Sequence, residues 1–388
     1  DSRRGFMKIG LAGFASLSLP GMLRLKAASA ASQTNEKTAV IMVWKPGGCS
    51  HIDTYDPKPQ AGSEYRGPFS TIPTAVPGMH FTELLPMQAK IADKFTVLRS
   101  MRQGAGGHPA GSMQMLSGDS DTRDKPKPRL PDWMSVTNYL RSLEGPRTVP
   151  LPAYVGVNPP TSYNGPAYLG DAYSPFSVSG DPNSPKFVVP NIGLTDQTEV
   201  KHLGRRASLR QNLDTLERAF DQAGELQALD EFETQAMTLL TNPKTKDAFD
   251  LTKEDDRTRD RYGRNTWGQQ LLLARRLVER GVRYVQIYSG GGHGDQNWDA
   301  HGHVEKNLGI HAPEIDRPIA GLIADLKQRG LLDETLIVWG GEFGRQSVSQ
   351  PGNPHGRDHN PLGFTYWLAG GGIKGGVAYG ETDELGHQ

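Results

Sequence analysis

Cysteine is almost absent from this sequence: Cys49 is the single cysteine among 388 residues. One thiol cannot form an internal disulfide or a thiolate cluster, so a metal site here would use nitrogen and oxygen ligands. An excess of charge is also missing, because 43 Lys and Arg residues balance 43 Asp and Glu residues. Without a basic field that attracts phosphate backbones, we expect no nucleic-acid partner.

Long apolar runs are missing as well, and no segment reaches the roughly 20 apolar residues that a membrane-spanning helix requires. We therefore expect no stable membrane span. The weakly apolar run Ile9–Leu23 is broken by glycine and proline, follows Arg3 and Arg4, and precedes the small residues 28–30. This order resembles a twin-arginine export signal over residues 1–30, which predicts the export machinery as a partner and a periplasmic or otherwise exported location. An amphipathic N-terminal helix is the alternative.

Apolar runs of strand length, most of them followed by glycine, alternate with helical periods along the chain. The strands are predicted at 38–44, 95–100, 152–157, 281–292, 334–345 and 364–372. Helical periods at 267–281 and 313–330 each end at a glycine, as helices commonly do. This alternation predicts an α/β fold with a mostly parallel central sheet and helices on both faces.

Residues 31–388 are expected to form one domain. The stretch 204–250 is polar and strongly helical. We interpret it as an inserted helical hairpin rather than a coiled-coil domain, because the heptad pattern is not sustained. The last residues end without a closing element, which leaves open that the chain is a truncated form of a longer protein. No internal repeat is present, and the oligomeric state is not predicted.

Histidine and acidic residues gather in the loops that follow the predicted strands. Ligands bind at the carboxyl ends of strands in such sheets, so these loops are the candidate site. Imidazole and carboxylate groups without cysteine suit one or two divalent ions such as zinc, manganese or calcium. The candidate ligands are His51, Asp53, Asp299, His301, His303, Glu342, Asp358 and His359.

Several of these residues have a structural alternative. Asp53 equally fits a turn cap before the "DPKP" motif. His293 and His311 are more simply solvated loop residues than ligands. A carboxylate directly after an apolar strand, as at Glu342, needs a cation nearby and so favours function. Arg345 and Arg357, our candidate catalytic residues together with His108, either pair with carboxylates or grip a tetrahedral anion.

Two stretches resemble sulfatases and other members of the alkaline phosphatase superfamily. Residues 315–345 look like the helix, "GLLDET" turn and strand that lead into a metal-binding Asp-His or Asp-Asn pair, and residues 108–118 look like the sulfatase signature. In that resemblance His108 stands at the place of the nucleophile. Asp299 and His303 reproduce the Asp-x-x-x-His spacing of related phosphate-transfer enzymes.

The chain as a whole resembles more closely the exported family called domain of unknown function 1501. His359 falls where related enzymes place another histidine ligand, whereas Glu342-Phe343 replaces the expected metal-binding pair. The resemblance is carried by the motifs "GGCSHIDTYDPKP", "RYGRNTWGQQLLLARRLVERGVRYVQI", "NWDAHGH", "GGEFGR" and "GRDHNP". It implies the alkaline phosphatase or sulfatase-like fold but no established activity.

These observations lead to two main hypotheses about function. The first is an exported metal-dependent hydrolase of a sulfate or phosphate ester, in a small molecule or a glycan. In it a metal-bound hydroxide attacks directly, His108 serves as general acid or ligand, and an arginine neutralises the developing charge. The second is a non-catalytic protein that binds an anionic glycan or a protein partner, since no Ser, Thr or Cys stands at the nucleophile position. A purely structural surface protein has little support.

Overall fold

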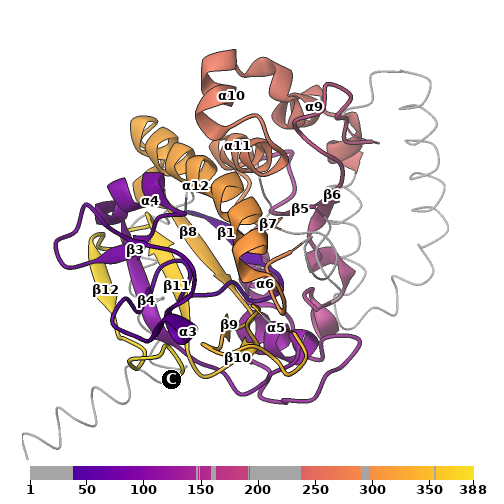
Figure 1. Cartoon of the computed structure of the whole chain (residues 1–388). Helices are drawn as coiled ribbons and strands as arrows, with labels where there is room; N and C mark the ends of the chain where they lie inside the picture. The colour runs from indigo at the N-terminus through magenta and orange to yellow at the C-terminus, as the bar shows by residue number, and fades with distance from the viewer. Residues whose placement is uncertain are drawn as a thin grey trace, which may run out of the picture. The chain divides into compact units, whose positions relative to one another are not determined.

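Eight strands form the central sheet of the computed structural model (Figure 1). They are β1 (Ala39–Lys45), β4 (Phe95–Met101), β5 (Tyr154–Val157), β6 (Phe176–Val178), β7 (Tyr284–Tyr288), β8 (Thr335–Gly341), β11 (Phe364–Ala369) and β12 (Val377–Tyr379). Their order is β12-β4-β11-β8-β1-β7-β5-β6. β11 runs antiparallel to both of its neighbours, and the other pairings are parallel. The predicted mostly parallel sheet is confirmed.

The structure describes residues 38–145, 147, 149–158, 163–190, 192, 237–289, 297–353 and 355–388. The predicted export signal at 1–30 and most of the predicted helical insertion, 204–236, lie outside these residues, as does His293. Residues Ala39–Gln388 form one compact unit. Within the described part of the chain, no helix combines the length and the apolar character needed to cross a membrane.

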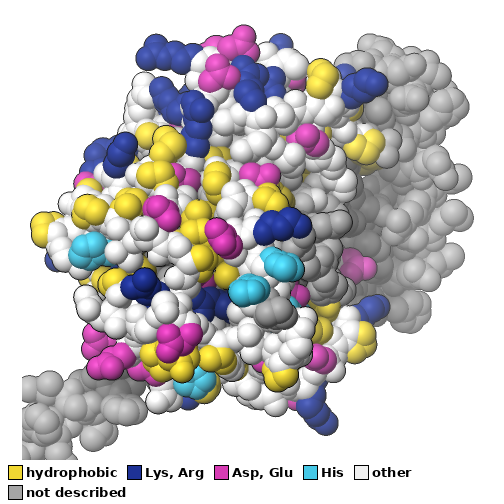
Figure 2. All heavy atoms as spheres, in the orientation of Figure 1, with side chains coloured by type: hydrophobic (Ala, Val, Ile, Leu, Met, Phe, Trp, Pro, Cys, Tyr) yellow, Lys and Arg dark blue, Asp and Glu magenta, His cyan; other side chains and the backbone are white. Residues whose placement is uncertain are grey.

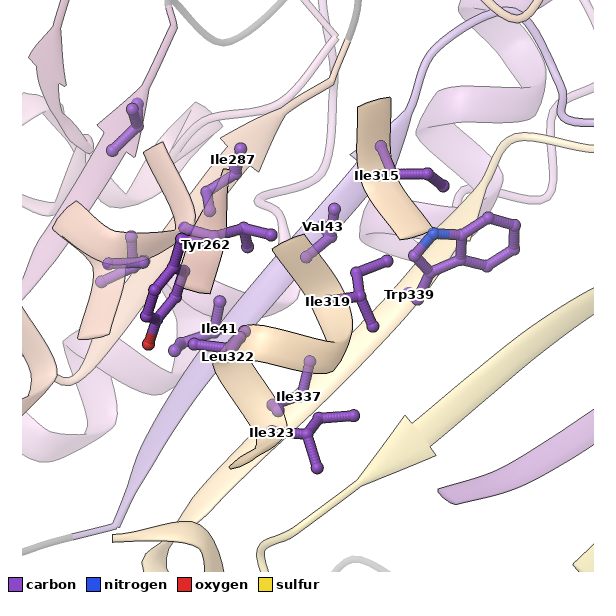
Figure 3. Close-up of a cluster of buried hydrophobic side chains, with 14 of the residues drawn as sticks. Ile41, Val43, Tyr262, Ile287, Ile315, Ile319, Leu322, Ile323, Ile337 and Trp339 are labelled. Atoms are coloured by element: carbon purple, nitrogen blue, oxygen red, sulfur yellow. The ribbon is translucent and has the colours of Figure 1, made fainter. Parts of the chain in front are cut away.

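Side chains that alternate along β1 enter two different apolar clusters, because successive residues of a strand point to opposite faces. Ile41 and Val43 pack with residues of α11 (Thr266–Glu279) and α12 (Val304–Gln328), as Figure 3 shows for α12. Met42 and Trp44 pack instead with residues of α5 (His108–Ser117) and α6 (Trp133–Ser142). Helices therefore cover both faces of the sheet, as predicted.

α12 begins earlier than the sequence pattern indicates. The pattern places the start at Pro313, but the helix begins at Val304 and contains Pro313 and Pro318 in its interior. Proline lacks a backbone donor, and it is most common in the first turn, which explains the misplaced boundary. The buried side chains of Leu308 and Ala312 pack into the core, and this contact stabilises the additional turns.

Shorter elements connect the sheet and its covering helices. Among the described residues, the other helices and strands are α3 (Ser63–Arg66), β2 (Thr71–Pro73), β3 (His80–Thr82), α4 (Pro86–Lys90), α9 (Pro243–Phe249), α10 (Asp256–Tyr262), β9 (Gly344–Arg345) and β10 (His359–Asn360). Single 3-10 turns occupy 92–94, 167–169, 171–173, 251–253 and 332–334. β9 and β10 form a separate antiparallel pair, which aligns Arg345 with His359. This pair brings two loops together at the end of β8.

Candidate metal centre

One edge of the sheet collects four side chains that could hold a metal ion. The carboxyl ends of β1, β4, β7 and β8 meet there, together with the amino end of the antiparallel β11. The four side chains are His108, Asp299, His301 and His359, and one potential ligand atom from each lies within 4.8 Å of all the others. We refer to these four residues as the His3Asp cluster.

The carboxylate of Asp299 lies at the middle of the His3Asp cluster. Its Oδ1 atom is 3.1 Å from Nε2 of His301 and 3.3 Å from Nε2 of His359. Its Oδ2 atom is 3.3 Å from Nε2 of His108. The two Nε2 atoms of His301 and His359 are 2.9 Å apart. All three imidazoles therefore direct the same ring nitrogen toward one small space.

Contacts on the outer side of two rings decide which nitrogen faces this space. Nδ1 of His359 lies 2.7 Å from the carbonyl oxygen of Gly106, and Nδ1 of His108 lies 2.8 Å from Oε1 of Glu342. Both partners are acceptors, so each ring donates through Nδ1. A ring in its neutral form then keeps a lone pair on Nε2 for a metal ion, whereas a protonated ring donates from Nε2 to Asp299. Metal-binding histidines are commonly oriented by such partners.

The site can accommodate an additional positive charge. Burial alone would raise the pKa of Asp299. Hydrogen bonds from His108 and His359 and the charge of Arg345 instead hold this pKa well below its ordinary value. Burial opposes protonation of His108, but hydrogen bonds to Asp299 and Glu342 outweigh it and raise the pKa of His108 to about 9. Burial and the nearby Arg345 lower the pKa of His301.

The donor set fits a divalent transition metal. Two ligands of a tetrahedral zinc ion, each about 2.1 Å from the metal, lie about 3.4 Å from each other. The separations between neighbouring ligand atoms here are 2.9, 3.1 and 3.3 Å. Geometry and ligand chemistry therefore both suit a metal ion.

Four of the residues predicted from the sequence meet in the His3Asp cluster. Three of them, Asp299, His301 and His359, were predicted as ligands, and His108 as a catalytic group or ligand. The predicted Asp-x-x-x-His pair is different: His303 is exposed, has a left-handed backbone (φ 51°) and forms the N-cap of α12. His301 takes part in its place, because the loop turns between the two histidines.

Other predicted ligands lie outside the His3Asp cluster. His51 is buried and contacts the carbonyl oxygen of Gly386 at 2.7 Å through Nε2. Asp53 forms a buried ion pair with Arg357. Asp358 accepts a hydrogen bond from the backbone N–H of His359 and lies 3.9 Å from Nδ1 of His301.

The two arginines predicted to be catalytic, Arg345 and Arg357, are buried and are not exposed to a substrate. Arg345 is 0% exposed and donates to the carbonyl oxygens of Gly47, Gly48 and Arg357 and to Asp299. Arg357 is 3% exposed and donates to Asp53 and to the carbonyl oxygens of Tyr65 and Gln346. Neither arginine is placed to bind a tetrahedral anion, as the sequence analysis considered, because both guanidinium groups are buried and bound to protein acceptors.

The sequence reasoning missed the backbone groups of the site. The carbonyl of Gly106 holds His359, and the N–H of Gly47 donates to Oε1 of Glu342 at 2.6 Å. The signal for both was present in the glycines of the "KPGGCSH" and "GAGGHP" loops, because glycine allows close approach of a backbone. Figure 2 shows one face of the molecule. On this face the histidines lie among both acidic and basic side chains, so no large patch of a single charge surrounds them.

Comparisons with known proteins give a family and similar solved structures. The family described as "Protein of unknown function (DUF1501)" matches residues 37–388. No curated protein matches the chain. One similar structure is the PsFucS1 sulfatase from Pseudoalteromonas sp., which is 15% identical, with 94% of this chain and 68% of the sulfatase covered and a TM-score of 0.40.

Two further solved structures are similar over most of the chain. The lipoteichoic acid synthase LtaP from Listeria monocytogenes is 9% identical, with 88% of this chain and 67% of LtaP covered and a TM-score of 0.37. The phosphonate monoester hydrolase SpPMH from Silicibacter pomeroyi is 11% identical, with 91% of this chain and 71% of SpPMH covered and a TM-score of 0.34.

Proposed function

This chain belongs to the DUF1501 family, and from that premise and its candidate metal centre we propose that it is an exported, metal-dependent hydrolase of a sulfate or phosphate ester. The convergence of the His3Asp cluster at the carboxyl ends of the strands carries the proposal. Ligands of parallel sheets bind at this edge. The substrate class is a small-molecule or glycan ester.

The four cluster residues would hold the ion through three imidazole nitrogens and one carboxylate oxygen. Such a set suits zinc or manganese better than calcium, which prefers an all-oxygen shell. When bound, a divalent ion of this kind acidifies a coordinated water and polarises an ester oxygen. The side chains of His108, His301 and His359 are 18%, 26% and 17% exposed, so solvent and a substrate can reach the cluster.

The protein's own groups define how a substrate would be received. The ring centroid of Phe343 lies 4.2 Å from that of His359 and 5.1 Å from that of His108, which gives the site one apolar wall. Arg345 neutralises Asp299 instead of facing outward. Because the nearest buried arginines are occupied, the charge of an anionic ester would be balanced by the ion, and turnover would depend on it completely.

The direct test is metal analysis combined with hydrolysis of aryl sulfate and aryl phosphate by the purified protein. We expect bound zinc or manganese, loss of hydrolysis after chelation and recovery when the metal is restored. Asp299→Asn should abolish both binding and turnover, whereas His80→Ala, an exposed histidine in β3, should change neither. A folded protein that binds no divalent ion would refute the proposal.

A second candidate function is supported by the burial of the arginines. A protein that binds an anionic glycan or a protein partner without turnover needs no nucleophile, and position 108 holds histidine rather than Ser, Thr or Cys. In that case the metal-loaded protein would bind a sulfated glycan, and no aryl ester would be hydrolysed at any metal concentration. With zinc at saturating concentration, Glu342→Gln distinguishes the two functions further, because it would reduce turnover in the hydrolase and leave glycan binding unchanged in a binder.

We also propose that residues 1–30 direct export of the folded protein. The support is Arg3 and Arg4 before a weakly apolar run and a small-residue cleavage site. Residues 1–30 fused to a fluorescent reporter should carry it across the membrane in bacteria with a twin-arginine pathway. Replacing both arginines by lysine should retain the reporter inside the cell, and continued export of that variant would contradict the proposal.

A further inference from the structure

We infer that Glu342 and Arg345 are positioning residues that hold two of the metal ligands in place before an ion binds. This inference rests on the proposed metal-dependent function. The two residues lie three positions apart, at the end of β8 and in β9. Both side chains are buried, at 1% and 0% exposure, and each contacts a different member of the His3Asp cluster.

Glu342 orients His108. Its Oε1 atom accepts from Nδ1 of His108 at 2.8 Å and from the backbone N–H of Gly47 at 2.6 Å. The first contact places the proton on Nδ1 and directs Nε2 toward Asp299. The second contact prevents the carboxylate from swinging into the cluster. Glu342 is therefore placed to support a ligand rather than to act as one.

Arg345 orients Asp299 in the same manner. Its Nη2 atom donates to Oδ1 of Asp299, and this leaves Oδ1 between the rings of His301 and His359. The guanidinium is itself fixed, because Nε donates to the carbonyl oxygen of Gly48 at 2.9 Å and Nη1 to that of Arg357 at 3.0 Å. A carboxylate bound to a fixed guanidinium loses little conformational freedom when it binds an ion.

The side chains of Glu342 and Arg345 both form hydrogen bonds with the turn that follows β1. Gly47 donates its N–H to Glu342 and accepts from Arg345 through its carbonyl oxygen. Only glycine fits there: φ is +98° at Gly47, and an added Cβ would lie 2.5 Å from the backbone nitrogen of Asp299. The turn after β1 is thus a rigid spacer between the two positioning residues, and it links the loops that carry His108 and Asp299.

The experiment measures metal affinity and ligand geometry in the full chain, without relying on activity. Metal-free protein is titrated with zinc against a chromophoric chelator, and the visible spectrum of the cobalt-loaded protein reports ligand geometry. We expect Glu342→Gln and Arg345→Lys each to weaken zinc binding about 10- to 100-fold and to change the cobalt spectrum. Glu254→Gln is the matched control, since it neutralises a buried carboxylate in the helix layer, and it should leave both readouts unchanged.

Each outcome decides a separate point. Wild-type protein that binds no zinc overturns the proposed function. Wild-type and variant proteins with equal zinc affinity and equal cobalt spectra overturn the positioning role and leave the proposed function standing. Glu342→Asp keeps the charge but shortens the side chain by one methylene. If Glu342→Gln fails to fold, the zinc affinity and cobalt spectrum of Glu342→Asp test the same role. A loss of thermal stability alone, with affinity unchanged, also counts against the inference.

Discussion

Buried charges occur in two regions of this protein, one among the helices and one at the strand ends. In the helix layer, Arg275 lies 2.6 Å from Glu254 and 2.9 Å from Asp325, and Arg276 also pairs with Glu254. The hydroxyl of Tyr262 donates to Asp325 at 3.0 Å. Arg275 also pairs with Glu279, and Asp325 also pairs with Arg261 and Arg329. Each buried charge of the helix layer thus has at least one partner of opposite charge within the protein.

The strand-end region has no such balance. There Asp299 and Glu342 face a single guanidinium, that of Arg345, and three imidazoles direct their Nε2 atoms toward the same space. A proton on His108, whose pKa is raised to about 9, or a metal ion would supply the missing charge. The excess of acceptors, rather than the burial of charge, therefore distinguishes the strand-end region from the helix layer.

The sharpest test of the comparison removes a charge from the helix layer. Arg275→Met leaves Glu254 and Asp325 buried with less compensation, so we expect the free energy of unfolding to fall by about 3 to 5 kcal/mol. Zinc affinity of the folded fraction should not change. Chemical denaturation and chelator competition measure the two quantities, and a change in zinc affinity would contradict the separation of the two regions.

The next test removes a ligand from the strand-end region. Wild-type protein should gain about 2.7 kcal/mol in the free energy of unfolding when zinc is present at 100 times its dissociation constant. His359→Ala should lose most of that gain, because its ring lies within 3.3 Å of both Asp299 and His301. Thermal unfolding with and without zinc measures this stabilisation. An equal stabilisation of wild type and His359→Ala would show that the ion binds elsewhere.

Lys45 provides a further test, of whether a buried amino group without an acidic partner destabilises the fold. Its Nζ atom is buried between the rings of Trp298 and Trp339, without a hydrogen-bond partner among the described residues. Burial lowers the pKa of Lys45 from its ordinary 10.5 to about 7. Between these values the unfolded chain keeps a proton that the folded chain has released, so the free energy of unfolding rises with pH.

Lys45→Met removes this titration. We expect the difference between wild type and Lys45→Met to change by up to about 1.4 kcal/mol per pH unit between pH 7 and 10.5, with the variant relatively more stable at the lower pH. Urea denaturation at several pH values measures the difference. Parallel pH profiles for the two proteins would show that Lys45 stays charged in the folded state.

The smallest effect is expected at the surface. Arg264 pairs with Asp256 and Asp260, but its side chain is 38% exposed and those of its partners are 90% and 57% exposed. Because water screens such pairs, Arg264→Met should change the free energy of unfolding by less than about 1 kcal/mol. A loss as large as that of Arg275→Met would mean that burial does not separate these ion pairs.

The alternation of apolar runs and helical periods was enough to predict most of the sheet. The six predicted strands correspond to β1, β4, β5, β7, β8 and β11. The short strands β6 and β12 were missed, since three residues carry little periodicity. The reversed direction of β11 was also out of reach, because direction depends on how the chain returns to the sheet and not on the strand's own residues.

What the sequence by itself determined is the type of chemistry: an α/β sheet, no thiolate ligands, and imidazole and carboxylate groups in the loops after the strands. Only the tertiary structure decided which of these groups meet. His301 rather than His303 enters the cluster because the backbone turns left-handed at His303, and Glu342 and Arg345 reach His108 and Asp299 from either side of the Gly47 turn, which both of them contact. Such choices depend on backbone angles and on contacts across about 300 positions of the chain, which residue types and spacing do not encode.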